Sequence, residues 1–330
     1  MTLKVGIIGA GQAGEHHAVG FSTVSGVRIT GIADLAMKRA TRVAERFDAQ
    51  PYEDWRHMLD GGLDILVVAL PHNLHVEPAE VAAARGMHLL MEKPIATTMD
   101  DARRIVDVCR EARVKLTISF VHRFRDELQI ARRWIQENQL GEPRAAIEIM
   151  NGQRGPHSPP WITNKEIAGG GVLMYGAIHS VDRLRWLLMS DVTAVAAQKQ
   201  HFEPRTEVED GVTALLTFTN GATATLSACA PAYRAQPAYW DSQIYGTQGM
   251  IRIRTRHWAE LSNDHISVRQ ESRSAVAMGE HYNFARQAQA FVNAILADDE
   301  PAISGDDGLR ALEVAMAIYH AASTGEIVRL

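Results

Sequence analysis

Short apolar runs alternate with amphipathic stretches through the first third of the chain. Several of these runs lack polar alternation, which is typical of parallel strands whose two sheet faces are both covered. The expected strands are residues 4–8, 27–34, 65–70, 88–91 and 115–119. Helical periodicity falls between them, in residues 12–22, 37–47, 76–85 and 99–113. The alternation predicts a doubly wound α/β domain that ends near residue 122.

The pattern changes after residue 122. A helix is expected over 127–138, then a loop rich in Gly and Pro, then a second helix over 172–188. From residue 192 to 268 the chain is rich in Thr, Val, Ile and Ala, with turn signals at Asn220-Gly221, Pro231 and residues 246–249. This stretch predicts consecutive antiparallel strands, followed by closing helices over 283–296 and 308–323. We therefore expect two domains, residues 1–122 and an α+β domain of residues 123–330.

Composition supports two domains and narrows the class of protein. The 330 residues exceed the size of about 250 to 300 at which single cores stop growing. A hydrophobic fraction of 46% argues against disorder. A net charge of −5 argues against a nucleic-acid partner and leaves a small ligand as the default. The cysteines, Cys109 and Cys229, are too few for a disulfide framework or a structural zinc site. With no signal-peptide pattern and no apolar stretch of about 18 residues, we expect a cytoplasmic protein that does not span a membrane.

A glycine loop follows the first expected strand. It fits the pattern G-x-G-x-x-G and consists of Gly9, Ala10, Gly11, Gln12, Ala13 and Gly14. Asp34 closes the second strand, 20 residues after Gly14, where an acidic side chain suits ribose hydroxyls. The alternative is a tight turn with a surface Asp, but the context favours dinucleotide binding. The Asp34 carboxylate would repel a 2′-phosphate, so NAD is favoured, while the nearby Lys38 and Arg39 keep NADP possible.

A second polar cluster follows two later strands. It comprises Leu70, Pro71, His72 and His75 after one strand, and Glu92-Lys93-Pro94 after the next. Ligands bind at the carboxyl ends of strands in an open parallel sheet, so these loops should face the cofactor. No cysteine or carboxylate cluster accompanies the histidines, so no metal site is expected. His16, His17 and His157 are interpreted as solvated or structural.

These motifs resemble, in order, those of the Gfo/Idh/MocA oxidoreductase family, the glucose-fructose oxidoreductase and inositol dehydrogenase group. The similarity continues through Arg123-Phe124, Trp161, Gly169 to Gly171 and His179, and it covers essentially the whole chain. The resemblance implies a Rossmann domain and a second domain with a large, mainly antiparallel open sheet, often used for oligomerisation, and hence a homodimer or homotetramer. It also implies that Lys93 binds the substrate hydroxyl beside the nicotinamide, with Glu92 near the nicotinamide ribose. An ammonium there would stabilise a developing alkoxide. The alternative for Glu92 and Lys93 is a surface ion pair.

The segment 169–182 resembles the family pattern G-G-G-x-L-x-D-x-G-x-H-x-x-D, with two departures. Tyr175 stands where Asp is common, and Ala177 replaces Gly. On an α-helix Tyr175, His179 and Asp182 would share one face. His179 is the candidate general acid/base, and Tyr175 either donates a proton or orients sugar hydroxyls. The alternative is a core histidine beside a packing tyrosine, and for Asp182 we expect a structural contact, with Arg185 or Arg123.

The expected function is hydride transfer between NAD(P) and a secondary alcohol or ketone of a sugar, polyol or related cyclic compound. Aromatic rings can stack on sugars and arginines can bind hydroxyls, so the expected substrate residues are His122, Arg123, Trp161, Tyr175 and His179. Weaker candidates are Arg154, Tyr233 and Trp240. Two other functions stay open at this point: an NAD-dependent glycoside hydrolase that oxidises its sugar transiently, and a nucleotide sensor without catalysis.

Overall fold

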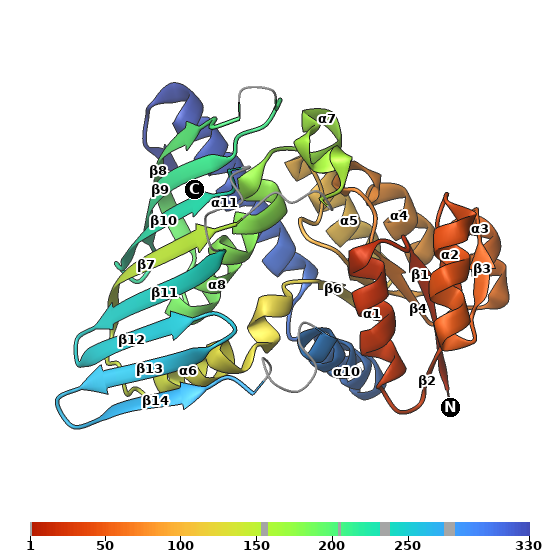
Figure 1. Cartoon of the computed structure of the whole chain (residues 1–330), viewed down its shortest axis with the longest axis horizontal. Helices are drawn as coiled ribbons and strands as arrows, with labels where there is room; N and C mark the ends of the chain where they lie inside the picture. Colours follow the sequence, from red (N-terminus) through yellow and green to blue (C-terminus); the bar gives the residue numbers. More distant parts are fainter. Residues whose placement is uncertain (1, 153–157, 204–205, 232–237, 274–280) are drawn as a thin grey trace. The chain divides into compact units, whose positions relative to one another are not determined.

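The computed structural model describes residues 2–152, 158–203, 206–231, 238–273 and 281–330. The chain divides into two compact units (Figure 1). The first comprises Met1–Phe124 and Ala277–Leu309, and the second comprises Arg125–Val276 and Arg310–Leu330. The chain therefore returns to the first unit late in the sequence, which a single boundary near residue 122 does not describe. Arg154 and Tyr233, two of the weaker substrate candidates, and His157 lie outside the described residues.

The first unit contains a six-stranded sheet in the order β3-β2-β1-β4-β5-β6, with every pairing parallel. Its strands are β1 Leu3–Ile8, β2 Val27–Ala33, β3 Gln50–Tyr52, β4 Ile65–Val68, β5 His88–Met91 and β6 Leu116–Ile118. The doubly wound sheet predicted from the apolar runs is confirmed. The edge strand β3 was not predicted, because three residues around Pro51 give no apolar run.

Helices flank this sheet in the first unit. They are α1 Gln12–Ser22, α2 Met37–Ala44, α3 Trp55–Met58, α4 Val76–Ala84, α5 Met99–Glu111 and α10 His281–Ala297, with single turns η1 Glu45–Phe47, η2 Leu59–Gly61, η3 His72–Leu74 and η4 Val121–Phe124. α10 packs against α1, where a Cβ on Gly20 would lie 2.8 Å from the carbonyl oxygen of Phe284. Phe291 and Val292 of α10 belong to the same apolar core as Val5 of β1. Helix α11, Gly305–Thr324, contains the division between the units.

The second unit contains a nine-stranded sheet in the order β14-β13-β12-β11-β7-β10-β9-β8-β15. Its strands are β7 Pro143–Asn151, β8 Val192–Gln200, β9 Gly211–Phe218, β10 Thr223–Cys229, β11 Tyr239–Gly246, β12 Gly249–Arg254, β13 Trp258–Asn263, β14 Ser267–Glu271 and β15 Val328–Arg329. Only the β7–β10 pairing is parallel among these strands, so the mainly antiparallel sheet is confirmed. Strand β7 was not predicted, because Arg144 and Glu148 interrupt its apolar residues.

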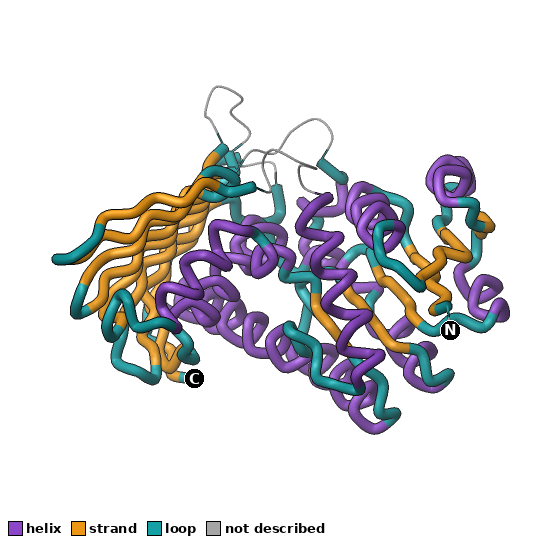
Figure 2. The backbone as a smooth tube through the Cα atoms, turned by 90° about the horizontal axis from the view of Figure 1, so that it is seen from below, coloured by secondary structure: helices purple, strands orange, loops and turns teal. Residues whose placement is uncertain are grey.

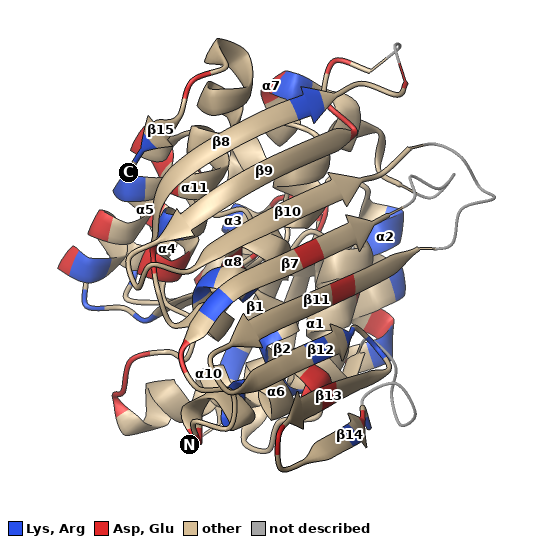
Figure 3. Ribbon diagram, turned by 90° about the vertical axis from the view of Figure 1, so that its left-hand side faces the viewer, with Lys and Arg blue, Asp and Glu red and all other residues tan. Residues whose placement is uncertain are grey.

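Helices cover one face of the nine-stranded sheet (Figure 2). α6, Asp126–Gln136, packs on β12 and β13, and α8, Ile178–Leu188, packs on β7; the short elements η5 Pro160–Thr163, α7 Lys165–Ala168 and η6 Leu173–Ala177 precede α8. On the other face, alternate residues of β9 and β10 are exposed, and neither strand carries a charged residue (Figure 3). Among the described residues, no helix has both the length and the apolar character needed to cross a membrane.

Candidate active site

The three glycines of the loop after β1 have different surroundings. Gly9 adopts φ +94°, and a Cβ there would overlap the carbonyl oxygen of Ala69. A Cβ on Gly14 would overlap the carbonyl oxygen of Gly9, so this glycine allows α1 to pack closely on β1. Around Gly11, by contrast, no atom lies within 4 Å of a Cβ position. Gly11 also begins α1 without a side-chain cap, which leaves helix N–H groups and the positive end of the helix dipole for a pyrophosphate. This open cradle fits a dinucleotide.

Asp34 lies beside this loop, directly after β2. Its Oδ2 accepts a hydrogen bond from the Ala10 N–H at 2.9 Å, and its Oδ1 accepts one from the Ala36 N–H at 2.8 Å. Arg39 of α2 forms a two-pronged ion pair with the same carboxylate, at 3.2 Å from Nε and 2.7 Å from Nη2. Burial raises the pKa of Asp34, but the Arg39 and backbone hydrogen bonds outweigh it and the pKa is lowered. The carboxylate predicted to bind ribose is thus charged and held toward the loop, with Arg39 as an exposed partner.

The loops after β4 and β5 are joined by a buried histidine. His75 has no exposed surface, and its ring nitrogens lie 3.1 Å from the carbonyl oxygens of Leu70 and Ile95. Burial lowers the pKa of His75, against the effect of these carbonyls and of the Glu92 charge. His72 is also buried, and Pro71 is partly buried beside it. In the part of the chain that the structure describes, no group of three acidic, His or Cys side chains is arranged to hold a metal.

Glu92 and Lys93 follow β5 directly, and the Lys93–Pro94 peptide bond is cis. The Glu92 N–H donates to the Val68 carbonyl at 2.9 Å, which extends the β4–β5 pairing to this point. Glu92 Oε1 lies 2.7 Å from Nε2 of His17, a buried residue of α1. Burial lowers the pKa of Lys93, and the Glu92 charge raises it. The sequence does not predict the His17 contact: a polar residue on the buried side of α1 marks His17, but nothing in the sequence indicates its partner.

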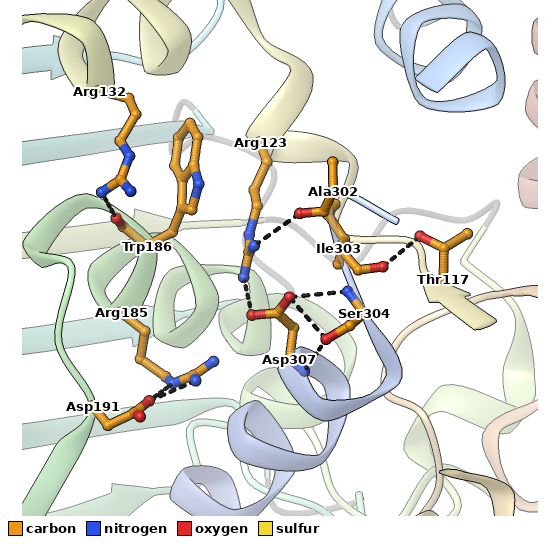
Figure 4. A network of polar contacts seen from close by, with 10 residues as sticks. All are labelled: Thr117, Arg123, Arg132, Arg185, Trp186, Asp191, Ala302, Ile303, Ser304 and Asp307. Carbon is orange, nitrogen blue, oxygen red and sulfur yellow. Dashed lines mark hydrogen bonds and ion pairs between the residues drawn. The ribbon is translucent and has the colours of Figure 1, made fainter. Parts of the chain in front are cut away.

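Arg123 has architectural partners within the first unit (Figure 4). Its Nη2 lies 2.8 Å from Oδ1 of Asp307, at the start of α11, and its Nη1 is 3.5 Å from the Ala302 carbonyl. Asp307 also accepts the Ser304 N–H at 3.0 Å. His122, the preceding residue, is buried in η4. Substrate contacts of His122 and Arg123 stay predictions, and the guanidinium already has a structural role.

In the second unit, the helix that carries Tyr175 and His179 differs from the expected single α-helix. Residues Leu173–Ala177 form a π-helical turn, and the α-helix begins at Ile178. A π turn changes the angular spacing of side chains, so the α-helical spacing used to predict a common face does not apply across Leu173–Ala177. Tyr175 is 37% exposed, His179 8% and Asp182 0%. The Tyr175 ring lies 6.3 Å from that of Trp161, which places these two predicted substrate residues together. Arg185, one of the two expected partners of Asp182, pairs with Asp191 at 2.6 Å (Figure 4).

The three glycines before this helix fit a buried carboxylate that sequence reasoning missed. Glu209 accepts hydrogen bonds from the N–H groups of Gly171 at 2.9 Å and Leu173 at 3.1 Å, and from the Tyr319 hydroxyl at 2.8 Å. A Cβ on Gly171 would overlap the Glu209 carbonyl, and one on Gly170 would overlap the Tyr319 hydroxyl. Burial and the Glu209 charge raise the pKa of Tyr319. Glu209 thus caps the segment that leads to His179.

A second buried carboxylate lies beneath the same helix. Glu148 of β7 accepts hydrogen bonds from Ser180 at 2.8 Å and from the Trp240 indole N–H at 2.7 Å, and Arg183 Nε lies 3.5 Å away. Burial raises the pKa of Glu148 against the Arg183 charge, and burial lowers the pKa of Arg183. The Trp240 ring lies edge-on to His179 at 6.0 Å. Trp240 therefore packs beside His179 while its polar atom is directed to the buried network.

The predicted site residues fall into two sets. The first unit holds the dinucleotide set and the amine, namely Gly9 to Gly14, Asp34, Leu70 to His75, Glu92 and Lys93, together with His122 and Arg123. The second unit holds the imidazole and aromatic set, namely Trp161, Tyr175 and His179. The first set can bind a pyrophosphate and a ribose and place a partly buried amine nearby. The second set offers an imidazole, which can accept or donate a proton, and aromatic rings that suit a sugar.

Both parts of the chain match models of known protein domains. Residues 3–120 match a model described as "Oxidoreductase family, NAD-binding Rossmann fold". The protein is therefore an oxidoreductase with an NAD-binding Rossmann fold. Residues 128–252 match the C-terminal domain of the same family. The chain belongs to the GFO/IDH/MocA family, and the family resemblance of its motifs is confirmed.

Relatives match over almost the whole length of the chain. The 1,5-anhydro-D-fructose reductase of Ensifer adhaerens is 27% identical, with 98% of each chain covered. The D-glucoside 3-dehydrogenase of Escherichia coli K12 is 26% identical, with 99% of this chain and 97% of the relative covered. Among solved structures, levoglucosan dehydrogenase in complex with NADH and levoglucosan has a TM-score of 0.92 at 23% identity, with 100% of this chain and 99% of that chain covered. This likeness confirms the fold of both units.

Proposed function

We propose that the protein transfers a hydride between NAD and a secondary alcohol or ketone of a sugar, polyol or related cyclic compound. The observation that carries the proposal is the arrangement at the carboxyl ends of β1, β2 and β5: an open glycine cradle, a charged Asp34 and the partly buried amine of Lys93. Relatives along the whole chain are named as a sugar-derivative reductase and a glucoside dehydrogenase. These names favour net oxidation or reduction of a substrate over the two alternatives, an NAD-dependent glycoside hydrolase and a nucleotide sensor without catalysis.

The chain's own residues supply binding and proton transfer in this proposal. Bound NAD supplies the acceptor for the hydride that leaves the alcohol carbon. Lys93 binds the hydroxyl oxygen, and its ammonium form stabilises the negative charge that develops there. His179 accepts the hydroxyl proton, so that the alcohol loses one hydride and one proton to become a ketone. Tyr175 and Trp161, whose rings lie together, present a wall for the sugar.

We also propose that NAD(H) binds more tightly than NADP(H), because Asp34 is charged and directed toward the loop. Arg39 partly neutralises that carboxylate and is exposed enough to turn toward a 2′-phosphate. Such a contact would reduce the preference for NAD(H) over NADP(H). Titration calorimetry with both cofactors tests this. A preference for NADP(H) of about tenfold or more, equivalent to about 1.4 kcal/mol, would reverse the assignment of Asp34.

Self-association through the uncovered face of the nine-stranded sheet is part of the proposal. This outer face is defined here by the exposed or half-buried residues of its central strands, such as Thr213, Leu215, Thr223 and Thr225. Leu215 is 49% exposed, and no charge protects β9 or β10. A homodimer or homotetramer would cover this surface. The two free cysteines fit a reducing compartment, so we propose a cytoplasmic site of action.

The test of function is a panel of sugars and polyols, read by nicotinamide absorbance with protein first freed of bound cofactor. On the best substrate, His179→Ala and Lys93→Met should each lower kcat/KM by at least about 100-fold, the lower range for a positioned acid/base. NADH affinity should stay within about threefold, because the cofactor set is unchanged. Tyr175→Phe removes only the hydroxyl and keeps the ring, so its effect on turnover measures the contribution of the hydroxyl alone. Near-normal turnover by His179→Ala would remove that residue from the mechanism and leave the cofactor assignment intact.

A further inference from the structure

His17 joins the helix of the glycine loop to the end of β5. It lies on α1, and its side chain is only 1% exposed. Its Nε2 lies 2.7 Å from Glu92 Oε1, although the two residues are 75 positions apart. Since Glu92 directly precedes Lys93, this contact joins α1 to the residue next to the proposed catalytic lysine.

Packing within the first unit fixes the His17 ring. The Phe284 ring of α10 meets it edge-on, with centroids 4.8 Å apart and planes at 83°. Phe284 can approach because Gly20, one turn further along α1, has no side chain to displace it. A ring enclosed between two helices and a strand end keeps one orientation, so the contact to Glu92 is set by the fold.

The Glu92 carboxylate is held at both oxygens. Oε1 contacts His17, and Oε2 accepts the Lys93 backbone N–H at 3.3 Å. The carboxylate charge raises the pKa of Lys93 against the effect of burial, and it acts in the same direction on His75. The position of this one charge therefore influences how far the Lys93 amine is protonated.

We propose that His17 is a positioning residue for Lys93: it holds the Glu92 carboxylate in the place where its charge acts on the lysine amine. This inference rests on the proposed function, in which Lys93 binds the substrate hydroxyl. His17 does not touch the reacting atoms in this scheme. It acts through Glu92, and a change at His17 should therefore be felt in turnover and in the pH profile rather than in cofactor binding.

Variants of the neighbouring histidines provide the test. His17→Ala should lower kcat by about tenfold or more, the scale for losing a hydrogen bond to a charged group. His17→Gln, whose amide N–H can reach the carboxylate, should recover most of this loss. His16→Ala is the matched control, because His16 also packs on Phe284, at 5.0 Å, while the Glu92 contact is made by His17. A tenfold weaker NADH affinity in His17→Ala, in step with kcat, would assign His17 to cofactor binding and overturn the proposal.

A double-mutant cycle with Glu92→Gln completes the experiment. Glu92→Gln removes the charge that raises the pKa of Lys93, so the alkaline limb of the kcat/KM profile should move to lower pH; His17→Ala should move it in the same direction. In the Glu92→Gln background, His17→Ala should change kcat by less than about twofold. If the two single effects instead multiply, His17 acts independently of Glu92 and the inference fails. Lys93→Met separates the two proposals: wild-type turnover in that variant would overturn the function proposed for Lys93, whereas collapsed turnover together with multiplying effects would overturn only the role of His17.

Discussion

The two sheets of the protein bury their apolar residues in different ways. In the first unit, all four residues of β4 are buried, as are five of the six in β1, because helices cover both faces. In the second unit, β9 and β10 alternate between buried and exposed residues, because one face has no cover within the unit. The first sheet is thus covered on both faces, whereas the second leaves one face uncovered within its unit.

The polar groups follow the same division. In the first unit they lie beyond the strand ends, in loops that the sequence marks with Gly, Pro and His. In the second unit, charges lie inside the structure, as Glu148 and Arg183 do beneath α8. A site at strand ends can therefore be found from local motifs. A site supported by interior charges requires knowledge of which distant residues meet.

The largest expected effect concerns the interior charges. Glu148→Ala would leave Arg183 buried without its carboxylate, and the free energy of unfolding should fall by about 3 to 5 kcal/mol. Urea denaturation measures this loss. The matched control is Asp241→Ala, on the opposite face of the adjacent strand. Its partner Arg254 is half exposed, so this ion pair should contribute at most about 1 kcal/mol. Equal losses of unfolding free energy in Glu148→Ala and Asp241→Ala would contradict the expected difference between the buried and the exposed face of this sheet.

The next effect concerns the outer face. Leu215→Lys would place a charge in the proposed contact between copies, and the apparent dissociation constant of the assembly should rise by about tenfold or more. Sedimentation at several concentrations measures it. The adjacent Leu216 is fully buried on the other face, so Leu216→Lys should unfold the unit instead. A wild-type protein that sediments as a monomer at micromolar concentration would refute self-association.

A smaller effect concerns two glycines of the loop after β1: Gly11, which has open space around it, and Gly14, which packs against Gly9. Gly11→Ala should leave the melting temperature unchanged, since nothing lies within 4 Å of the new Cβ and the backbone is extended with φ −75°. NADH affinity should nevertheless fall by about tenfold, or about 1.4 kcal/mol. Gly14→Ala provides the contrast, because its Cβ would overlap Gly9 and disturb the fold. Unchanged NADH affinity in Gly11→Ala would exclude close approach of the cofactor there.

The smallest effect concerns the thiols and leaves activity unchanged. Burial raises the pKa of Cys109, in α5, to about 12, and burial also raises the pKa of Cys229, on the half-exposed side of β10. A raised pKa keeps a thiol protonated at pH 8, and the thiolate is the reactive form, so both should react slowly with a disulfide reagent. Cys229 should react first, and Cys109 only after unfolding. Faster reaction of Cys109 than of Cys229 would contradict the burial of Cys109 in the first unit.

Local signals account for what the sequence predicted well. The apolar runs located five of six strands in the first sheet. The spacing of Gly14 and Asp34 singled out a carboxylate that the structure holds beside the glycine loop, and its binding of ribose stays a prediction. Strand β7 was missed because Glu148 reads as a polar interruption until Arg183 and Trp240 are known to enclose it.

Contacts between distant residues account for what the sequence could not give. The capping of Gly171 by Glu209 spans 38 residues and the His17 contact to Glu92 spans 75, and no local pattern encodes either pairing. The π turn at Leu173–Ala177 was also hidden, because its residues suit an α-helix equally well.

The late return of the chain to the first unit bears on how the protein is made. Phe291 and Val292 of α10 complete the apolar core built on β1, yet the whole of β7 to β14 is synthesised before them. At about 5 to 20 residues per second, the N-terminal strands wait on the order of ten seconds or more for their missing layer to leave the ribosome. During that interval the apolar residues of β1 and α1 that will pack against α10 lack their cover.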